Sequence, residues 1–342
     1  MRIAVSGSIA TDHLTVFPGR FTDQLIPGQL DHVSLSFLVD DLEVRRGGVA
    51  ANIAFGLGGL GLRPLLIGAV GSDFGPYEVW LKEHGVDTGG VLVSGERQTA
   101  RFMCTTDQDA NQIAAFYAGA MAEARDIDLA ALTGDTGAGP AAAGARPDLV
   151  LIAPNDPEAM LRHTRQCREL GIPFAADPSQ QLARLDGGQV RDLVDGARWL
   201  FTNEYEAALL LERTGWTHGR MLDRVGTWIT TLGGSGARAE RADGTLLHVP
   251  AVPDVPVADP TGVGDAFRAG FLAATAWGLA LTAAARLGCA VAAEAIRTVG
   301  SQSYDATPDR LLANLTAAYG ADAAAESAPH LEAATREGGD AS

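Results

Sequence analysis

Lysine is nearly absent from this 342-residue chain: Lys82 is the only one, and the remaining basic residues are arginines. Chemistry that needs a lysine, such as a Schiff base, therefore has one candidate at most. The Walker-A pattern G-x-x-x-x-G-K-[ST] does not occur. Cysteine is scarce too. Cys104, Cys167 and Cys289 are scattered along the chain, which argues against a zinc ribbon, a redox dithiol and a disulfide framework.

Basic clusters and long apolar runs are also missing. The net charge is −16, and runs of arginine with interleaved aromatics do not occur, so we expect no nucleic-acid partner. The longest uncharged stretch, 269–285, falls just short of a membrane span and is interrupted at Gly270 and Gly278. It predicts two buried helices joined near Gly278, and no membrane partner. The start of the chain lacks a signal-peptide pattern, so we expect a cytoplasmic protein.

The arrangement of apolar residues predicts an α/β fold. Short buried strands alternate with amphipathic helices, a pattern typical of a parallel sheet that is covered on both faces. We expect strands over 2–7, 64–70, 149–153, 173–176, 199–202 and 228–232, and helices over 49–60, 74–84, 157–170 and 204–214.

Two further segments do not fit that alternation. In 32–44, apolar residues occupy every second position, and 99–106 and 112–117 resemble a strand pair joined by a polar turn. We interpret them as a small separate β-sheet inserted in two pieces, at about 12–45 and 97–118. The low-complexity segment 134–146 predicts a mobile surface loop. The acidic, alanine-rich tail 321–342, which follows a domain over 1–320, predicts frayed helix or disorder.

The strongest motif is Asp-Pro-Thr-Gly-Val-Gly-Asp at 259–265, where a glycine-rich turn enters a helical pattern. The backbone N–H groups of such a turn face one point at a helix N-terminus and form an anion site. Asp265 falls in the first helical turn, beside that site. Because a carboxylate repels a bound anion, its presence favours proton abstraction over simple binding. The alternative is an N-capping aspartate after a glycine turn.

Three more motifs carry polar side chains to the starts of helices or the ends of strands. Gly47 and Gly48 open a helix with Asn52 one turn in, or else they form a glycine hinge beside an exposed asparagine. Asn203 and Glu206 follow a buried strand on one helix face, which suits orienting water around Mg²⁺ or an ordinary N-cap with a glutamate at the third position. The segment 231–236 follows another buried strand and predicts a nucleotide loop.

One pattern misleads. The segment 56–61 matches G-x-G-x-x-G, but it closes a predicted helix and precedes a strand. A dinucleotide fingerprint follows a strand and opens a helix, so we predict no NAD site here.

Taken in order, the four motifs resemble those of the ribokinase-like (PfkB) family of sugar and nucleoside kinases, over residues 1–318 or so. The resemblance implies a three-layer αβα core with a mainly parallel sheet and a small β-sheet lid. It implies Asp265 as general base, and it implies ATP and Mg²⁺ as cofactors while leaving open a monovalent cation such as K⁺. Asn203 and Glu206 would hold the magnesium through water. The anion hole would comprise Gly262, Val263, Gly264 and Asp265, and ATP would lie beside Asn203, Thr231, Leu232, Gly233, Gly234, Ser235, Gly236 and Gly264.

Within the family, the stretches 6–14, 33–42 and 177–185 resemble the actinobacterial type of adenosine kinase. That resemblance implies phosphorylation of the adenosine 5′-hydroxyl, a role in purine salvage, and a homodimer formed through the lid. Phe102 and Phe116 would sandwich the adenine, although core residues of the lid are the alternative. Arg184 would approach the transferred phosphoryl group. Gln180 and Gln181 would approach the base, and Ser8, Asp12, Ser36, Gly48 and Asn52 would hold the ribose.

Two other functions stay open at this point. The acceptor could be ribose, fructose or another nucleoside, since the family motifs do not separate these. The chain could also be a nucleoside-binding regulator without activity, although the intact Asp265 and its glycine turn argue against that.

Overall fold

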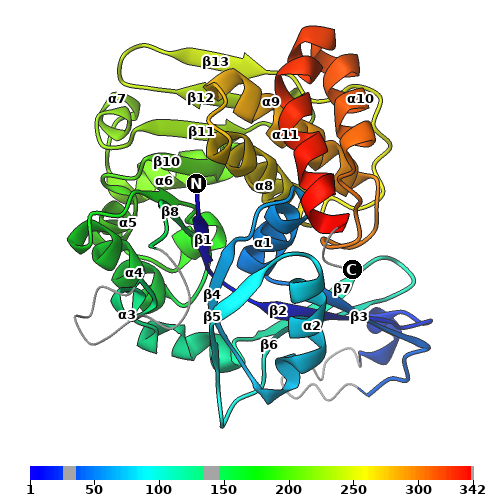
Figure 1. Ribbon diagram of the computed structural model, residues 1–342. Helices are drawn as coiled ribbons and strands as arrows, with labels where there is room; N and C mark the ends of the chain where they lie inside the picture. The colour runs from blue at the N-terminus through cyan, green and yellow to red at the C-terminus, as the bar shows by residue number, and fades with distance from the viewer. Residues whose placement is uncertain (26–35, 134–145, 340–342) are drawn as a thin grey trace.

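The computed structural model describes residues 1–25, 36–133 and 146–339, with the backbone alone from 334 onward, and contains two separate sheets (Figure 1). The larger has nine strands in the order β13-β12-β11-β10-β9-β8-β1-β4-β5, parallel from β11 to β5, with β12 and β13 antiparallel. Its strands are β1 (Ile3–Ser6), β4 (Leu65–Val70), β5 (Asp87–Val93), β8 (Leu149–Ile152), β9 (Phe174–Ala176), β10 (Trp199–Asn203), β11 (Thr227–Thr231), β12 (Ala237–Glu240) and β13 (Leu246–Val249).

Helices cover both faces of this sheet, because successive strand residues point to opposite sides. Ile3 and Val5 of β1 belong to one buried cluster and Ala4 to another. The first cluster lies under α1 (Val49–Gly59), α2 (Gly75–Glu83), α8 (Val263–Ala276), α9 (Leu281–Ile296), α10 (Pro308–Tyr319) and α11 (Ala321–Gly339). The second lies under α3 (Leu129–Thr133), α4 (Pro157–Glu169), α5 (Gly187–Val194), α6 (Glu204–Thr214) and α7 (His218–Leu222). The predicted three-layer αβα core is therefore confirmed.

Short 3-10 helices complete the connections. They are η1 (Phe21–Gln24), η2 (Ser72–Phe74), η3 (Gly119–Asp126), η4 (Ser179–Ala183) and η5 (Gly233–Ser235). The predicted pair of buried helices over the longest uncharged stretch is also confirmed: α8 and α9 are joined at Gly278, whose φ of +81° suits glycine.

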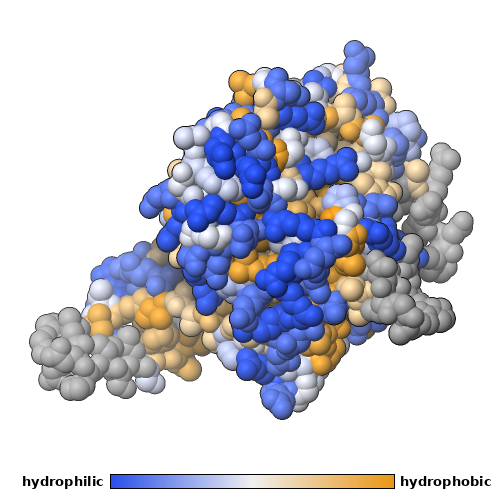
Figure 2. All heavy atoms as spheres, turned by 90° about the vertical axis from the view of Figure 1, so that its left-hand side faces the viewer, coloured by the Kyte–Doolittle hydropathy of each residue, from blue (hydrophilic) through white to orange (hydrophobic). Residues whose placement is uncertain are grey.

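The smaller sheet is the lid, with strand order β3-β2-β6-β7. Its strands are β2 (Ala10–Val16), β3 (Asp41–Gly47), β6 (Ala100–Thr106) and β7 (Gln112–Tyr117), so the predicted insertion in two pieces is confirmed. Figure 2 shows it standing out from the body of the molecule as a lobe on which apolar side chains gather.

The predicted strand over 32–44 is wrong in its position. Residues 32–35 lie outside the described residues, and the strand runs from Asp41 to Gly47. Phe37, which the alternation assigned to a strand, packs its ring 4.7 Å from that of Phe17 and 5.4 Å from that of Phe21. A small aromatic cluster at the tip of the lid therefore accounts for the apolar side chain there. The predicted loop over 134–146 lies outside the described residues except for its last one.

The tail also differs from the expectation of frayed helix or disorder, because α11 is helical from Ala321 to Gly339. Ala323, Ser327 and Leu331 are buried and spaced four apart, which places them on one face of the helix. His330 stacks on Trp277 at the end of α8, with ring centroids 5.2 Å apart. That buried stripe holds the tail on the core despite its acidic composition. In the described part of the chain, no helix is both long and apolar enough to cross a membrane.

Candidate active site

The motif residues meet at the carboxyl edge of the large sheet, where parallel α/β sheets bind their ligands. Ser8 follows β1, Asp177 follows β9, Asn203 ends β10 and Thr231 ends β11. Four segments that are far apart in sequence thus reach one edge.

The segment 259–265, which we call the anion loop, is a glycine-rich turn that enters a helix, as predicted. Gly262 is the N-cap of α8 with φ +75°, and a Cβ there would lie 2.5 Å from the Cβ of Ser301, so only glycine fits. The side chain of Asp259 fixes the turn by accepting hydrogen bonds from the backbone N–H of Thr261 (2.8 Å) and of Gly300 (3.0 Å). The first-turn N–H groups of α8 have no partner within the helix, so they are available to bind an anion, and the anion hole stays a prediction.

Asp265 lies in this first turn and is partly buried. Its Oδ2 accepts a hydrogen bond from Nδ2 of Asn52 at 2.8 Å. Burial raises the pKa of Asp265 to about 7, although the charge of Arg268 and the hydrogen bond from Asn52 act in the opposite direction. A carboxylate with a pKa near neutrality is suited to take a proton and release it again.

A buried ion pair beside Asp265 was not predicted from the sequence. Arg268, one turn further along α8, donates from Nη2 to Oδ1 of Asp177 at 2.7 Å, and its Nε lies 2.6 Å from Oδ2. Nη1 also donates to the carbonyl of Gly264 at 2.9 Å. Burial raises the pKa of Asp177 to about 6, while Arg268 opposes that rise. The arginine thus ties the anion loop to the end of β9.

The start of α1 brings the second motif to the same place. Gly48 has φ +94°, and a Cβ there would lie 2.6 Å from the backbone of Ser8 and Ala10. Ser8 substitutes for the missing side-chain cap, because its Oγ accepts the N–H of Val49 at 3.0 Å. Asn52 is 6% exposed and faces Asp265. The glycine pair therefore opens a helix, as predicted, and the alternative of an exposed asparagine is wrong.

The predicted nucleotide side lies on the two neighbouring strands. Asn203 of β10 pairs directly with Thr231 of β11. Asn203 and Glu206 form a capping box, each side chain accepting the other's backbone N–H at 2.8 Å. The N-cap alternative is thus realised, and it fixes both side chains at the helix start. The water-mediated contact with magnesium stays a prediction.

The glycine-rich loop after β11 is open. Gly233, Gly234 and Ser235 are exposed, and Leu232 and Thr231 are partly buried. Gly236 turns the chain at φ +94°, where a Cβ would lie 2.0 Å from the carbonyl oxygen of Val249.

Lid residues predicted to hold the nucleoside line up across the sheet. In the strand register, Asp12 of β2 lies opposite Arg45 of β3 and opposite Phe102 of β6, and Phe102 lies opposite Phe116 of β7. Directly opposed residues share one face of a sheet. Phe102 and Phe116 therefore stand side by side on the face that also carries Asp12.

This face borders a hollow of about 560 Å³, whose other wall includes Asp259 and Thr261 of the anion loop. Arg45 spans from the lid to the core, with Nη1 3.5 Å from Oδ2 of Asp259. Burial raises the pKa of Asp12, and Arg45 opposes the rise.

The remaining predicted residues make no hydrogen bond to Asp265 or to the anion loop in the described structure. Gln180 and Arg184, on and just after η4, are exposed, as is Ser36 before β3. Gln181 is 5% exposed, and its Oε1 has no hydrogen-bond partner among the described residues. Asn155 follows β8 and was not predicted. It is 1% exposed, and its Nδ2 also has no hydrogen-bond partner among the described residues.

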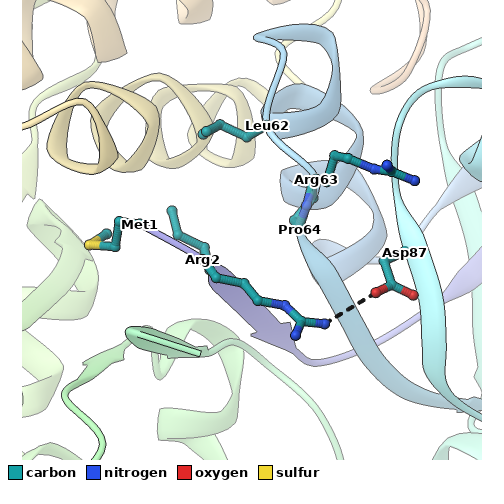
Figure 3. A pocket seen from close by; sticks show the side chains of 7 residues that line it. Met1, Arg2, Leu62, Arg63, Pro64 and Asp87 are labelled. Atoms are coloured by element: carbon teal, nitrogen blue, oxygen red, sulfur yellow. Dashed lines mark hydrogen bonds and ion pairs between the residues drawn. The ribbon is translucent and has the colours of Figure 1, made fainter. Parts of the chain in front are cut away.

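A second hollow, of about 370 Å³, lies at the opposite, amino edge of the sheet (Figure 3). It is bordered by Met1 and Leu62, and Arg2 reaches across it to Asp87 at 3.3 Å. None of the four motifs reaches this edge, so the candidate site is the one at the carboxyl edge.

Comparisons with known proteins agree on one family. A model of the pfkB family carbohydrate kinases matches residues 10–309. A nucleoside kinase of Methanothermobacter thermautotrophicus is 31% identical over 277 residues, which are 80% of this chain and 85% of that protein.

Solved structures agree as well. The nucleoside kinase of Burkholderia thailandensis in complex with inosine is 34% identical, with a TM-score of 0.77 over 93% of this chain and 98% of that one. The same protein in complex with ADP-inosine gives a TM-score of 0.76. The nucleoside kinase of Methanocaldococcus jannaschii is 26% identical, with a TM-score of 0.79 over 92% and 98%.

Proposed function

The chain belongs to the PfkB family of carbohydrate kinases, which phosphorylate a hydroxyl with ATP, and we propose that its own acceptor is the 5′-hydroxyl of adenosine. The observation that carries the proposal is the carboxylate of Asp265, with a pKa near 7 and a hydrogen bond from Asn52, held beside N–H groups that open α8 and have no partner within the helix. A base and an anion hole side by side are what phosphoryl transfer to an alcohol requires.

In this mechanism, the oxygen of the 5′-hydroxyl forms a bond to the γ-phosphorus, and Asp265 accepts the proton that the hydroxyl releases. The bond between that phosphorus and the β–γ bridging oxygen breaks, and ADP leaves with the electron pair. The N–H groups of Val263, Gly264 and Asp265 stabilise the charge on the transferring group. Arg184 would add a positive charge from the end of η4. Closure of the lid would exclude water, which otherwise competes as the acceptor.

ATP would lie along the ends of β10 and β11. Asn203 and the segment 231–236 offer backbone and side-chain polar groups on adjacent strands. The described residues contain no group of three or more His, Cys, Asp or Glu that could hold a metal ion. This fits Mg²⁺, which keeps most of its waters and binds mainly to phosphates. Asn203 and Glu206 would hold it through water, and it would neutralise phosphate charge. Dependence on K⁺ stays a prediction.

Recognition of the nucleoside would be divided between the core and the lid. Asp12 and Asn52 would bind the ribose hydroxyls, with Ser8, Ser36 and Gly48 shaping that end. Phe102 and Phe116 offer adjacent aromatic faces, and stacking a base on such a face contributes roughly 1–3 kcal/mol. Gln180 and Gln181 would contact the base edge, which suits the unpartnered Oε1 of Gln181.

Adenosine, rather than another nucleoside, rests on the stretches 6–14, 33–42 and 177–185, which resemble the actinobacterial adenosine kinases. A role in purine salvage follows from that acceptor. The second candidate is a purine nucleoside kinase of wider specificity, favoured by the relative that was solved with inosine.

The test is an acceptor panel. Adenosine, inosine, cytidine, ribose and fructose are each incubated with ATP and Mg²⁺, while ADP release is followed and the products are separated by chromatography. We expect the highest kcat/KM with adenosine and a product identical to AMP. A preference for inosine would favour the second candidate, and a preference for ribose or fructose would contradict a nucleoside kinase. Failure to release ADP with any acceptor would indicate a binding protein without activity.

We also propose a homodimer formed through the lid. All six side chains of the edge strand β7 are exposed, and such edges pair readily with another strand. Light scattering at micromolar concentration should give twice the chain mass of 35.5 kDa, and a mass of one chain would contradict it.

A further inference from the structure

A chain of buried and partly buried hydrogen bonds leads from α2 to Asp265. The indole Nε1 of Trp80 donates to Oε1 of Gln302 at 3.1 Å, and Nε2 of Gln302 donates to Oδ1 of Asn52 at 2.9 Å. Nδ2 of Asn52 then donates to Oδ2 of Asp265 at 2.8 Å. Gln302 is 5% and Asn52 6% exposed, so the bond between these two side chains is shielded from water, while the two end bonds are partly buried.

The direction of every bond in this chain is determined. An indole N–H can only donate, so the oxygen of the Gln302 amide must face Trp80. The amide nitrogen of Gln302 then points the other way, toward the oxygen of Asn52. With its oxygen so occupied, Asn52 presents its nitrogen to Asp265.

Two neighbours support the same orientation. The hydroxyl of Ser301 lies 3.0 Å from Oδ1 of Asn52 and 3.3 Å from the carbonyl oxygen of Arg46, and we assign its one hydrogen to the nearer acceptor, Asn52. The hydroxyl of Tyr77 accepts the other N–H of Gln302, because its own hydrogen goes to the carbonyl of Gly47 at 2.9 Å. A reversed Asn52 amide would place oxygen against the carboxylate of Asp265 and leave donors facing donors.

We propose that Trp80 and Gln302 are positioning residues that act through Asn52 to hold the base, Asp265, in its proton-accepting form and orientation. The inference rests on the proposed function, which assigns Asp265 as the base. It also limits how Asn52 meets a substrate. Since its oxygen is saturated, Asn52 can contact a ribose oxygen only through its remaining N–H, as a donor.

Asp265 has other charged neighbours, and their effects must be separated from that of the hydrogen-bond chain Trp80–Gln302–Asn52, which we call the relay. Arg268 on its own helix favours the carboxylate. Asp177 at the end of β9 and Glu206 on α6 both raise its pKa. Tyr304, which follows α9, lies near enough for Asp265 to affect its hydroxyl. None of these groups bonds to Trp80 or Gln302 in the described structure, so changes there leave these charges in place.

The experiment compares pH profiles of kcat/KM for adenosine with ATP and Mg²⁺ in the wild type, Trp80→Phe and Gln302→Met. Without the bond from Gln302, the Asn52 amide is no longer held with its nitrogen toward Asp265. The bond that Asn52 donates to the carboxylate is then weakened, which disfavours the carboxylate, so the acid limb of the profile should move to higher pH. We expect a shift of about one pH unit for Gln302→Met, the size expected when a hydrogen bond from Asn52 to the charged carboxylate is lost.

Trp80→Phe removes the indole N–H together with part of the ring that packs against Phe55 and lies under the Arg46 guanidinium. It leaves the bond between Gln302 and Asn52 in place and should move the limb less, in the same direction.

Above the acid limb, both variants should recover a rate near that of the wild type, because Asp265 is ionised there whatever its pKa. Trp277→Phe is the matched control. It removes an indole at the far end of α8, stacked on His330, and should leave the limb in place.

The outcomes are distinct. An unchanged limb in both variants, or a loss of rate by the same factor at every pH, would overturn the relay. If Gln302→Met fails to fold, the limb of Trp80→Phe decides alone. Asp265→Asn separates this result from the proposed function. If Asp265→Asn keeps both a near-normal rate and the acid limb near pH 7, Asp265 is not the base, and both proposals fall. A limb near pH 6 in the low residual activity of that variant belongs to Asp177 and leaves the assignment standing. If Asp265→Asn loses the limb near pH 7 but Trp80→Phe does not shift it, only the role of Trp80 and Gln302 is refuted.

Discussion

The core wall of the candidate site, which carries Asp265, and its lid side, which carries Phe116, are built differently. On the core side, Asp265 and Arg268 are already bonded to Asn52 and Asp177. On the lid side, Phe116 is 53% exposed, and the whole of β7 faces solvent. In the proposed mechanism, Asp265, which meets the transition state, is thus positioned before any ligand binds. The aromatic side chains proposed to recognise the nucleobase would be covered only once a ligand binds and the lid closes.

The largest expected effect falls on the core wall. Asp265→Asn keeps the shape of the side chain but removes the proton acceptor, so kcat should fall roughly 10²- to 10⁴-fold, the range for a lost general base. Steady-state kinetics with adenosine measure it. Asp309→Asn, at the exposed start of α10, is the matched control and should have no effect. A near-normal kcat in Asp265→Asn would remove the assignment.

The anion loop should respond almost as strongly. In Gly262→Ala, the added Cβ meets Ser301 at a backbone angle that favours glycine, so the N–H groups that open α8 must shift. We expect kcat to fall about 10²- to 10³-fold, as for one lost donor of an anion hole. Gly278→Ala has a similar φ of +81° in open space and should cost stability without lowering kcat. Equal kinetic losses in both variants would point to backbone strain alone.

Phe102 of the lid should determine the affinity for the nucleobase, and Asp12 of β2 the affinity for the ribose. Phe102→Ala should raise KM for adenosine by roughly 5- to 150-fold, from the stacking energy at 1.4 kcal/mol per tenfold. Asp12→Ala should lower kcat/KM for every ribonucleoside alike, because it removes an acceptor for the ribose hydroxyls. Kinetics with adenosine and a pyrimidine ribonucleoside test both. Met103→Ala, on the opposite face of the same strand, is the control, and an unaltered KM in Phe102→Ala would make Phe102 a core residue of the lid.

The smallest effect is the pH dependence of the wild type. The raised pKa of Asp265 means that the carboxyl is protonated, and inactive as a base, below about pH 7. kcat/KM should therefore fall as the pH is lowered, by about tenfold at pH 6. Asp177 titrates nearby, with a pKa of about 6, so the residual activity of Asp265→Asn serves as the reference. A profile that is flat between pH 6 and 8 would show that Asp265 is ionised throughout.

Much of the core wall could be predicted from the sequence because its motifs are local. A glycine turn followed by Asp265, or Asn203 with Glu206 three residues later, contains its own geometry within a few residues. The inner strands of the parallel sheet are buried on both faces and are visible as short apolar runs, whereas the edge strand β5 is only partly buried and was not predicted. β2 lacks such a run, because its side chains are nearly all half-exposed, and it was not predicted.

The partners of the motif residues could not be predicted, since they come from distant segments. Arg268 looks like one polar residue in an apolar helix until the fold brings Asp177, 91 residues away, against it. A lone arginine in a buried helix does signal a missing partner, because an unpaired buried charge is costly. Gln302 lies 250 residues from Asn52, and nothing local distinguishes it from a surface glutamine.

The most direct test of this division between core and lid measures two quantities in two variants. The adenosine dissociation constant, from titration calorimetry, and kcat are determined for Asp265→Asn and Phe102→Ala. We predict that Asp265→Asn lowers kcat with little change in affinity, whereas Phe102→Ala weakens binding with little change in kcat at saturation. Loss of kcat in both variants, with affinity unchanged in both, would contradict the account.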